Sequence, residues 1–216
     1  MAARDDILGR VRAALGPARG REVEVPRDYR RTMYAPGDLL DVFAERVEDY
    51  RATVTRVAAA DMAAAVAAAL AARGARRIAA APGLNPAWLP AAAAGADAGG
   101  TGVEVVVDDP PLAVPVLDGV DGAITGCAVG IAETGTIVLD GSPACGRRIL
   151  TLIPDYHLCV VRADQVVGGV PEAVAALDPR RPLTFVSGPS ATSDIELERV
   201  EGVHGPRTLV VLLVEG

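Results

Sequence analysis

Three short segments combine chemically active side chains with glycines, and each lies next to an apolar run. The first is TGCAVGIAETGTIVLD, residues 125–140, where Glu133 stands between two apolar stretches. A carboxylate that is partly removed from water is a good general base or nucleophile. Glycines permit a tight turn and close approach of a ligand, so we expect Thr134, Gly135 and Thr136 to contact it. The alternative is a hairpin in which Glu133 caps a turn at the surface.

The second segment, SGPSATSDIE at residues 187–196, follows an apolar run. Ser193 and Glu196 have the spacing of a capping box, which predicts that a helical turn begins there. A glycine-containing turn between a strand and a helix presents backbone N–H groups to an anion. The pattern is neither a P-loop nor a dinucleotide fingerprint, and the alternative is a well-capped loop without a ligand. The expected ligand contacts are Gly188, Ser190 and Thr192.

The third segment, GVHGPR at residues 202–207, places an imidazole shortly before a guanidinium and ahead of the last apolar run. Arg207 can hold a carboxylate or a phosphate through two parallel hydrogen bonds. Histidine can transfer protons near neutral pH, so His204 is the candidate acid or base. The alternative is a turn in which His204 bonds to the backbone and Arg207 pairs with a surface acid.

A fourth group combines Arg147 and Arg148 with PDYH at residues 154–157. The two arginines could reach an acidic partner or a ligand, and Asp155 could pair with His157. His157 opens the apolar run HLCVV, and this position favours a buried histidine that satisfies the fold. We therefore expect a structural role for His157.

The cysteines Cys127, Cys145 and Cys159 show no CxxC pairing, and the chain has only two histidines. This pattern predicts that the chain holds no metal, neither zinc nor an iron–sulfur cluster. An odd number of cysteines without pair spacing also indicates free thiols in a reducing compartment. Cys159 lies in an apolar run and is expected in the core. Cys127 is the better candidate for a reactive thiol, although a structural role is favoured for it as well.

Composition and charge exclude several classes of protein. Of the 216 residues 50% are hydrophobic and 23% charged, which is ordinary for one globular domain. The net charge of −7 and the lack of a basic stripe argue against a nucleic-acid partner. The longest apolar stretch, residues 58–72, is mostly alanine and too weakly hydrophobic to span a bilayer. No secretion-signal pattern is visible, so we expect a cytoplasmic protein.

Hydrophobic periodicity predicts the elements that must position these segments. Helical spacing predicts helices over 4–15, 39–50, 59–73 and 171–177, and a glycine-rich loop is expected at 95–102. The β-α-β order of the first half indicates a parallel sheet covered by helices, that is, an α/β fold. Strands are predicted over 52–57, 77–81, 103–107, 123–125, 128–132, 136–139, 157–161, 183–186 and 209–214.

The polar, proline-containing stretch before the second helix divides the chain. We predict an N-terminal helix with an extended connector at residues 1–36 and one domain at residues 37–216. In an open α/β sheet, ligands bind where loops leave the carboxyl ends of the strands. We therefore expect Glu133, the 187–193 loop and the 204–207 turn to converge there on one pocket for a small anion.

Four ordered stretches resemble those of the LUD-domain family, and within it the lactate utilization protein C type. They are TGCAVGIAETGTIVLD (125–140), LIPDYHLCVV (152–161), SGPSATSDIE (187–196) and GVHGPRTLVVLL (202–213). The resemblance implies a Rossmann-like open sheet similar to that of the isomerase, CoA-transferase and folate-cycloligase group. An N-terminal helical segment would precede this sheet.

The resemblance implies a role in oxidising L-lactate to pyruvate, so that lactate serves as a carbon source. It implies that this chain is the cluster-free subunit, binds no cofactor itself and works with separate iron–sulfur subunits. The roles given to Glu133, Ser190 and Arg207 are inferred from the residues. Two other hypotheses remain: a free-standing CoA- or acyl-transferase or sugar-phosphate isomerase-like enzyme that uses Glu133, and a non-catalytic ligand sensor or scaffold.

Overall fold

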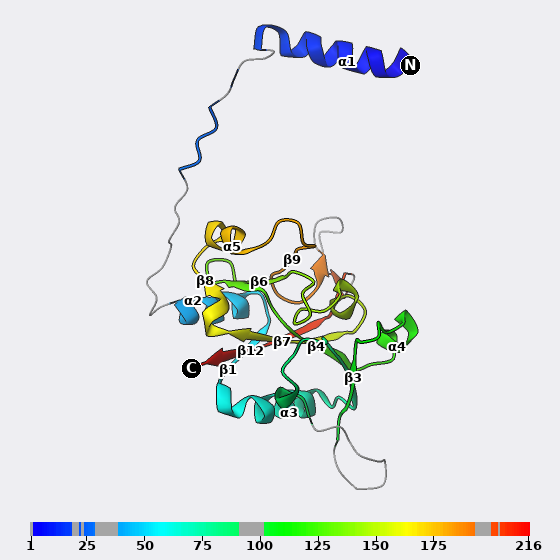
Figure 1. Cartoon of the computed structure of the whole chain (residues 1–216), viewed down its shortest axis with the longest axis vertical. Helices are drawn as coiled ribbons and strands as arrows, with labels where there is room; N and C mark the ends of the chain where they lie inside the picture. Colours follow the sequence, from blue (N-terminus) through cyan, green and yellow to red (C-terminus); the bar gives the residue numbers. More distant parts are fainter. Residues whose placement is uncertain are drawn as a thin grey trace.

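An N-terminal helix, α1 (Ala2–Leu15), and the 3-10 turn η1 (Gly16–Ala18) precede the body of the protein. Figure 1 shows α1 apart from that body, and its apolar residues Ile7, Val11 and Leu15 are exposed. The predicted connector and the glycine-rich loop at 95–102 fall largely outside the described residues. The computed structural model describes residues 2–18, 22, 24–28, 39–90, 102–192, 200–202 and 204–216.

The body is built on a six-stranded sheet with the order β1-β12-β7-β4-β2-β3, and every neighbouring pair is parallel. Central parallel strands are buried on both faces, which explains the unbroken apolar runs of β7 and β12. The sheet confirms the α/β class and the open parallel arrangement predicted from the sequence. Its strands are β1 (Thr53–Ala58), β2 (Arg77–Ala80), β3 (Glu104–Val107), β4 (Gly122–Gly126), β7 (Tyr156–Arg162) and β12 (Thr208–Glu215).

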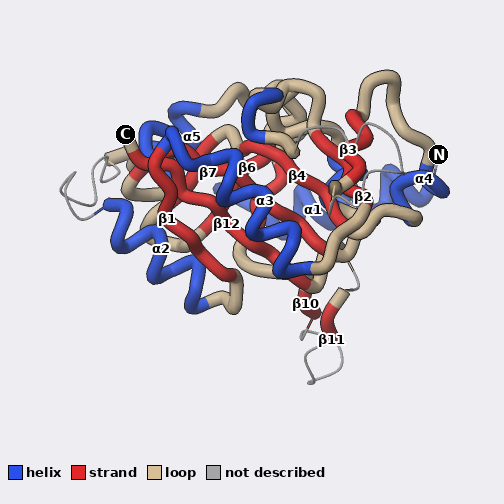
Figure 2. The backbone as a smooth tube through the Cα atoms, turned by 90° about the horizontal axis from the view of Figure 1, so that it is seen from below, coloured by secondary structure: helices blue, strands red, loops and turns tan. Residues whose placement is uncertain are grey.

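Helix α3 (Met62–Arg73) crosses one face of this sheet, as the view in Figure 2 shows. Its Val66 and Leu70 belong to a core cluster with sheet residues such as Ile124 and Leu158. Gly74 ends the helix in the left-handed conformation, with φ of 70°, where an L side chain would be strained. The turns η2 (Ala59–Asp61) and η3 (Pro86–Trp88) lie beside α3. The short α4 (Val114–Asp118) lies near the β3 edge of the sheet (Figure 1).

The opposite face is covered by α2 (Leu39–Asp49) and by a second sheet with the order β8-β5-β6-β9. Figure 1 shows these elements on the side away from α3, with α5 (Val170–Ala176) outermost. Phe43 and Val47 of α2 pack with β7 and β12 residues in a second core cluster. The strands of the second sheet are β5 (Val129–Ile131), β6 (Thr136–Leu139), β8 (Val166–Val167) and β9 (Thr184–Val186).

Short elements at the two ends of the main sheet complete the fold. The 3-10 turn η4 (Arg148–Thr151) precedes β7, and η5 (Ala163–Gln165) follows it. β10 (Ala191–Thr192) and β11 (Val200–Glu201) form an antiparallel pair. The capping box at Ser193 and Glu196 lies outside the described residues. Within the described ranges, no helix is both long and apolar enough to cross a membrane.

Candidate functional site

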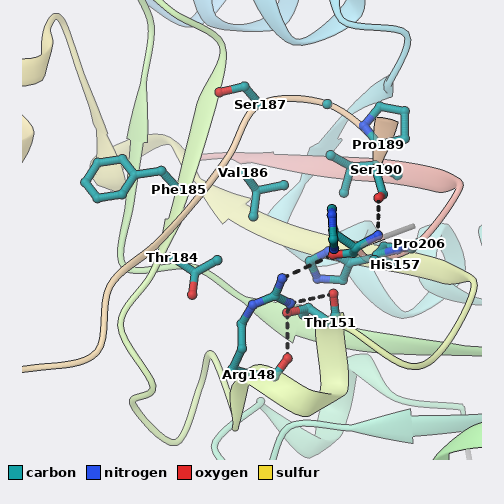
Figure 3. Close-up of a pocket in the computed structure, with 14 residues that line it drawn as sticks. Arg148, Thr151, His157, Thr184, Phe185, Val186, Ser187, Pro189, Ser190 and Pro206 are labelled. Atoms are coloured by element: carbon teal, nitrogen blue, oxygen red, sulfur yellow. Dashed lines mark hydrogen bonds between the residues drawn. The ribbon is translucent and has the colours of Figure 1, made fainter. Parts of the chain in front are cut away.

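A cavity of about 230 Å³ lies beside the amino ends of β7 and β12 (Figure 3). Its walls come from segments that are far apart in sequence: η4, the start of β7, β9 with the loop after it, and the turn before β12. The fold therefore brings the second, third and fourth sequence motifs together. The polar side chains of the lining belong to Arg148, Thr151, His157, Thr184, Ser187, Ser190 and His204.

The lining carries the chemistry of an anion site. It contains one arginine and both histidines of the chain, and none of the described residues that line it is acidic. His157 and Thr151 are buried, with 1% and 4% of their surface exposed, whereas Arg148 and His204 lie at the exposed side. A guanidinium with two imidazoles and no carboxylate favours a negatively charged ligand.

Arg148 is held in place but keeps hydrogen-bonding capacity. Its Nη1 donates to the carbonyl oxygen and to Oγ1 of Thr151, at 2.8 and 2.9 Å, and its Nη2 donates to the His204 carbonyl at 3.3 Å. Among the described residues, no partner takes the Nε–H or the second Nη2–H of Arg148. Elsewhere in the chain this same pair of nitrogens binds an aspartate: Arg147, Arg162 and Arg207 all do so. At Arg148 no carboxylate of the described residues takes that place.

The loop that faces Arg148 is fixed by its own hydrogen bonds. Ser190 N–H donates to the Pro206 carbonyl at 2.9 Å, and Ser190 Oγ accepts from the His204 N–H at 3.0 Å. Gly188 has φ of 80°, and a Cβ there would come within 2.5 Å of the Tyr50 carbonyl oxygen, so only glycine fits. Figure 3 shows the Arg148 side chain reaching from η4 towards this loop.

His157 has a structural partner and also faces the cavity. Its Nε2 is 2.8 Å from Oγ1 of the buried Thr125. The acid–imidazole pair that Asp155 could have formed with His157 is absent, because Asp155 binds Arg207 through bonds of 2.7 and 2.9 Å. That ion pair lowers the pKa of Asp155. The satisfied histidine expected from the sequence thus lies at the base of the cavity.

The predicted ligand residues are distributed unevenly around this cavity. Gly188, Ser190 and His204 line it. Arg207 does not line it, and its side chain is 61% exposed and paired with Asp155. Thr192 belongs to β10, and its side chain lies outside the described part of the chain.

The Glu133 turn lies next to the cavity without lining it. The turn packs against α2, since a Cβ on Gly135 would overlap the backbone of Arg46. Thr136 Oγ1 is 2.7 Å from Thr134 Oγ1 and 2.8 Å from Ser187 Oγ, so a row of hydroxyls links the turn to the rim. Glu133 itself is half-buried, and its catalytic role stays a prediction.

The cavity lies at the amino ends of β7 and β12, whereas we expected a site at the carboxyl ends of the strands. The reason is the order of the chain: the 204–207 turn precedes β12, and His157 begins β7. Local patterns gave Ser190 and His204, and they left open whether Arg148 would reach an acidic partner or a ligand. The proximity of Arg148 to a turn 56 residues later places it in the lining of the cavity.

The cysteines lie in the core between the two sheets, and all three are free and buried. Cys127 Sγ donates to Gln165 Oε1 at 3.6 Å, and Cys159 Sγ donates to the Gly126 carbonyl at 3.7 Å. The interaction with the neighbouring Cys159 thiol raises the pKa of Cys127 together with burial, and it lowers the pKa of Cys159. Burial raises the pKa of Cys145 to about 11. Among the described residues, no group of at least three His, Cys, Asp or Glu side chains is placed to hold a metal ion.

Fold and cavity together define an α/β protein with a parallel sheet and a pocket suited to an anion. The sequence profile of the LUD domain matches residues 116–214, which include every residue that lines the cavity. The lactate utilization protein C of Deinococcus radiodurans is 49% identical over 181 residues, which cover 82% of this chain and 80% of the relative. The chain therefore belongs to the LUD-domain family and is of the lactate utilization protein C type.

Other relatives match over a shorter part. A lactate utilization protein C of Shouchella clausii is 32% identical over 102 residues, 44% of this chain and 44% of the relative. The uncharacterized protein YkgG of Escherichia coli is 37% identical over 94 residues, 40% of each chain. A solved structure of a DUF162 family protein from Deinococcus radiodurans has a TM-score of 0.67 at 41% identity, and the match covers 84% of this chain and 99% of that chain.

Proposed function

We propose that this chain acts in lactate utilization and binds a small 2-hydroxy- or 2-oxocarboxylate in the cavity beside β7 and β12. The proposal rests on the surroundings of Arg148. This arginine lines a cavity together with both histidines, and no carboxylate of the described residues contacts its Nε or Nη2. The role in lactate utilization is suggested by the names of the relatives. The cavity is where we place the carboxylate of the bound acid.

The chemistry of lactate fits the groups that surround the cavity. Its carboxylate would accept two parallel hydrogen bonds from Arg148, the arrangement that guanidinium groups favour. Its hydroxyl would then lie near His204 and Ser190, which line the same cavity. Oxidation to pyruvate removes the hydroxyl proton and the Cα hydrogen with its electron pair. An imidazole can accept the proton, and the hydride equivalent would pass to an acceptor outside this chain.

In this proposal the electrons pass to separate iron–sulfur subunits, and this chain holds the organic acid. The family resemblance motivates the partners. If the purified chain alone reduced a dye with L-lactate, the proposal that the electrons pass to separate iron–sulfur subunits would be wrong.

The proposal is tested by growth on L-lactate as the sole carbon source. A strain lacking the gene should fail to grow on L-lactate and should grow normally on glucose. The wild-type gene and an Arg180→Gln variant should restore growth, since Arg180 is exposed and pairs only locally with Asp178. Arg148→Gln should restore little. Normal growth of the deletion strain on L-lactate would refute the role, and full rescue by Arg148→Gln would refute the site.

A further inference from the structure

A second cavity lies at the opposite end of the main sheet. It has a volume of about 290 Å³ and is lined by residues that follow or end three parallel strands: Gly83 after β2, Cys127 after β4, and Arg162 at the end of β7. The strand order reverses at this place, because β3 lies on one side of β2 and β4 on the other. In open α/β sheets, small ligands bind in the crevice at such a reversal.

The walls of this second cavity are close-packed backbone. Gly83 N–H and Gly126 N–H donate to the carbonyls of Pro143 and Ala144, each at 2.8 Å. A Cβ on Gly83 would come within 2.6 Å of Pro143, so a larger residue would force this segment outwards. The cavity is thus shaped by glycines that allow two loops to meet closely.

Its free polar groups are hydrogen-bond donors. Asn85 Oδ1 accepts from the Ala87 N–H, which leaves the Asn85 amide nitrogen available. Arg162 donates from Nε and Nη2 to the exposed Asp164, and no partner among the described residues takes its Nη1. The Gln165 side-chain amide is already used within the protein, because it donates to the Cys127 carbonyl. None of the described residues that line the cavity is acidic, so an anion rich in acceptors is favoured.

One aromatic side chain, Trp88, joins the aliphatic residues Leu84, Ala144 and Val160 in the wall. Trp88, the single tryptophan of the chain, lines the cavity and is half-buried. An aromatic face binds planar rings by stacking, with ring nitrogens and oxygens left to accept hydrogen bonds. The volume is close to the lower limit of small-ligand pockets, roughly 300 Å³, which suits a mononucleotide better than a dinucleotide.

We propose that this second cavity binds a mononucleotide, with its base against Trp88 and its phosphate at Arg162. The proposal is independent of the lactate site, since the two cavities share no lining residue. Trp88 serves as the probe, because all tryptophan fluorescence of the protein comes from this cavity wall.

The experiment titrates the full-length protein with AMP, GMP and UMP and follows both tryptophan emission and the heat of binding. At least one nucleotide should produce a saturable signal, and its nucleoside and inorganic phosphate should each bind at least about tenfold more weakly. Arg162→Gln should weaken nucleotide binding by about tenfold or more. Arg180→Gln should leave it unchanged, because Arg180 pairs with Asp178 in the same way but lies elsewhere.

Absence of saturable emission change and of binding heat with all three nucleotides would overturn the proposal. So would equal affinity of the wild type and of a folded Arg162→Gln variant. L-Lactate should not compete with the nucleotide, so a failure here is separate from a failure of the lactate site. Should the Arg162→Gln variant not fold, Asn85→Ser provides a second test; it keeps an oxygen for the Ala87 N–H but removes the free amide donor.

Discussion

Replacing Arg147 by methionine should destabilise the protein measurably at neutral pH. Arg147 donates two hydrogen bonds, of 2.7 and 2.6 Å, to Asp108, whose side chain is completely buried. Without Arg147, this carboxylate still accepts a hydrogen bond from the Leu112 N–H at 2.8 Å. Leaving a charged buried group short of partners costs about 1.5–3 kcal/mol. The 42% exposure of the Arg147 side chain places the expected loss near the lower value, about 1.5–2 kcal/mol.

For a domain of this size that loss corresponds to a fall in Tm of roughly 3–8 °C, measured by thermal unfolding followed by circular dichroism. The effect should depend on pH. The Arg147 hydrogen bonds lower the pKa of Asp108 in the folded state, so the stabilisation is present above the unfolded pKa of about 3.9 and disappears as the pH falls through the folded value. The difference between wild type and variant should therefore shrink below about pH 4.

Arg180→Met is the matched control, because its ion pair with Asp178 is mostly exposed. It should leave Tm unchanged at every pH. If Arg147→Met behaved like this control at pH 7, the reasoning about the buried Asp108 would be refuted. The pair matters for function because Arg147 also donates to the Leu112 carbonyl at 2.9 Å and so anchors the segment that carries Arg148.

Three other predictions follow from particular residues. Gly188→Ala should lower the free energy of unfolding by about 1–3 kcal/mol in denaturant titrations, since φ is 80° and Tyr50 leaves no room; an unchanged midpoint would contradict the loop geometry. Ellman's reagent should react slowly with all three buried cysteines in the native protein and fully in guanidinium; one fast native thiol would contradict their placement. Elemental analysis and a visible spectrum of the purified chain should show no stoichiometric iron, zinc or flavin.

The main sheet was predictable because its central strands are apolar on both faces. The run predicted over 209–214 corresponds to β12 (Thr208–Glu215), and the helix predicted over 59–73 corresponds to η2 and α3. Elements of few residues escaped prediction, among them α4 and β8 (Val166–Val167). Such short elements carry too few residues for a period to show, and tertiary packing decides their conformation.

The site was predictable only in its local parts. Ser190 and His204 stand in recognisable turns, but the pairing of Arg207 with Asp155 joins residues 52 apart. No local pattern shows whether Arg148 or Arg207 forms an ion pair with a carboxylate of the protein itself. Arg207, which was expected to hold the ligand, pairs with a carboxylate, whereas Arg148, for which a ligand or an acidic partner was expected, lines the cavity.

The central claim is that Arg148, His157 and His204 share one site for a small carboxylate, and histidine NMR tests it most directly. The chain has only two histidines, both in the lining, so the imidazole signals report on this cavity alone. Titration with L-lactate or pyruvate should shift both signals in a saturable way. In Arg148→Gln the affinity should fall by about tenfold or more. Imidazole signals that do not move with either acid would contradict the account, as would equal titration curves for wild type and variant.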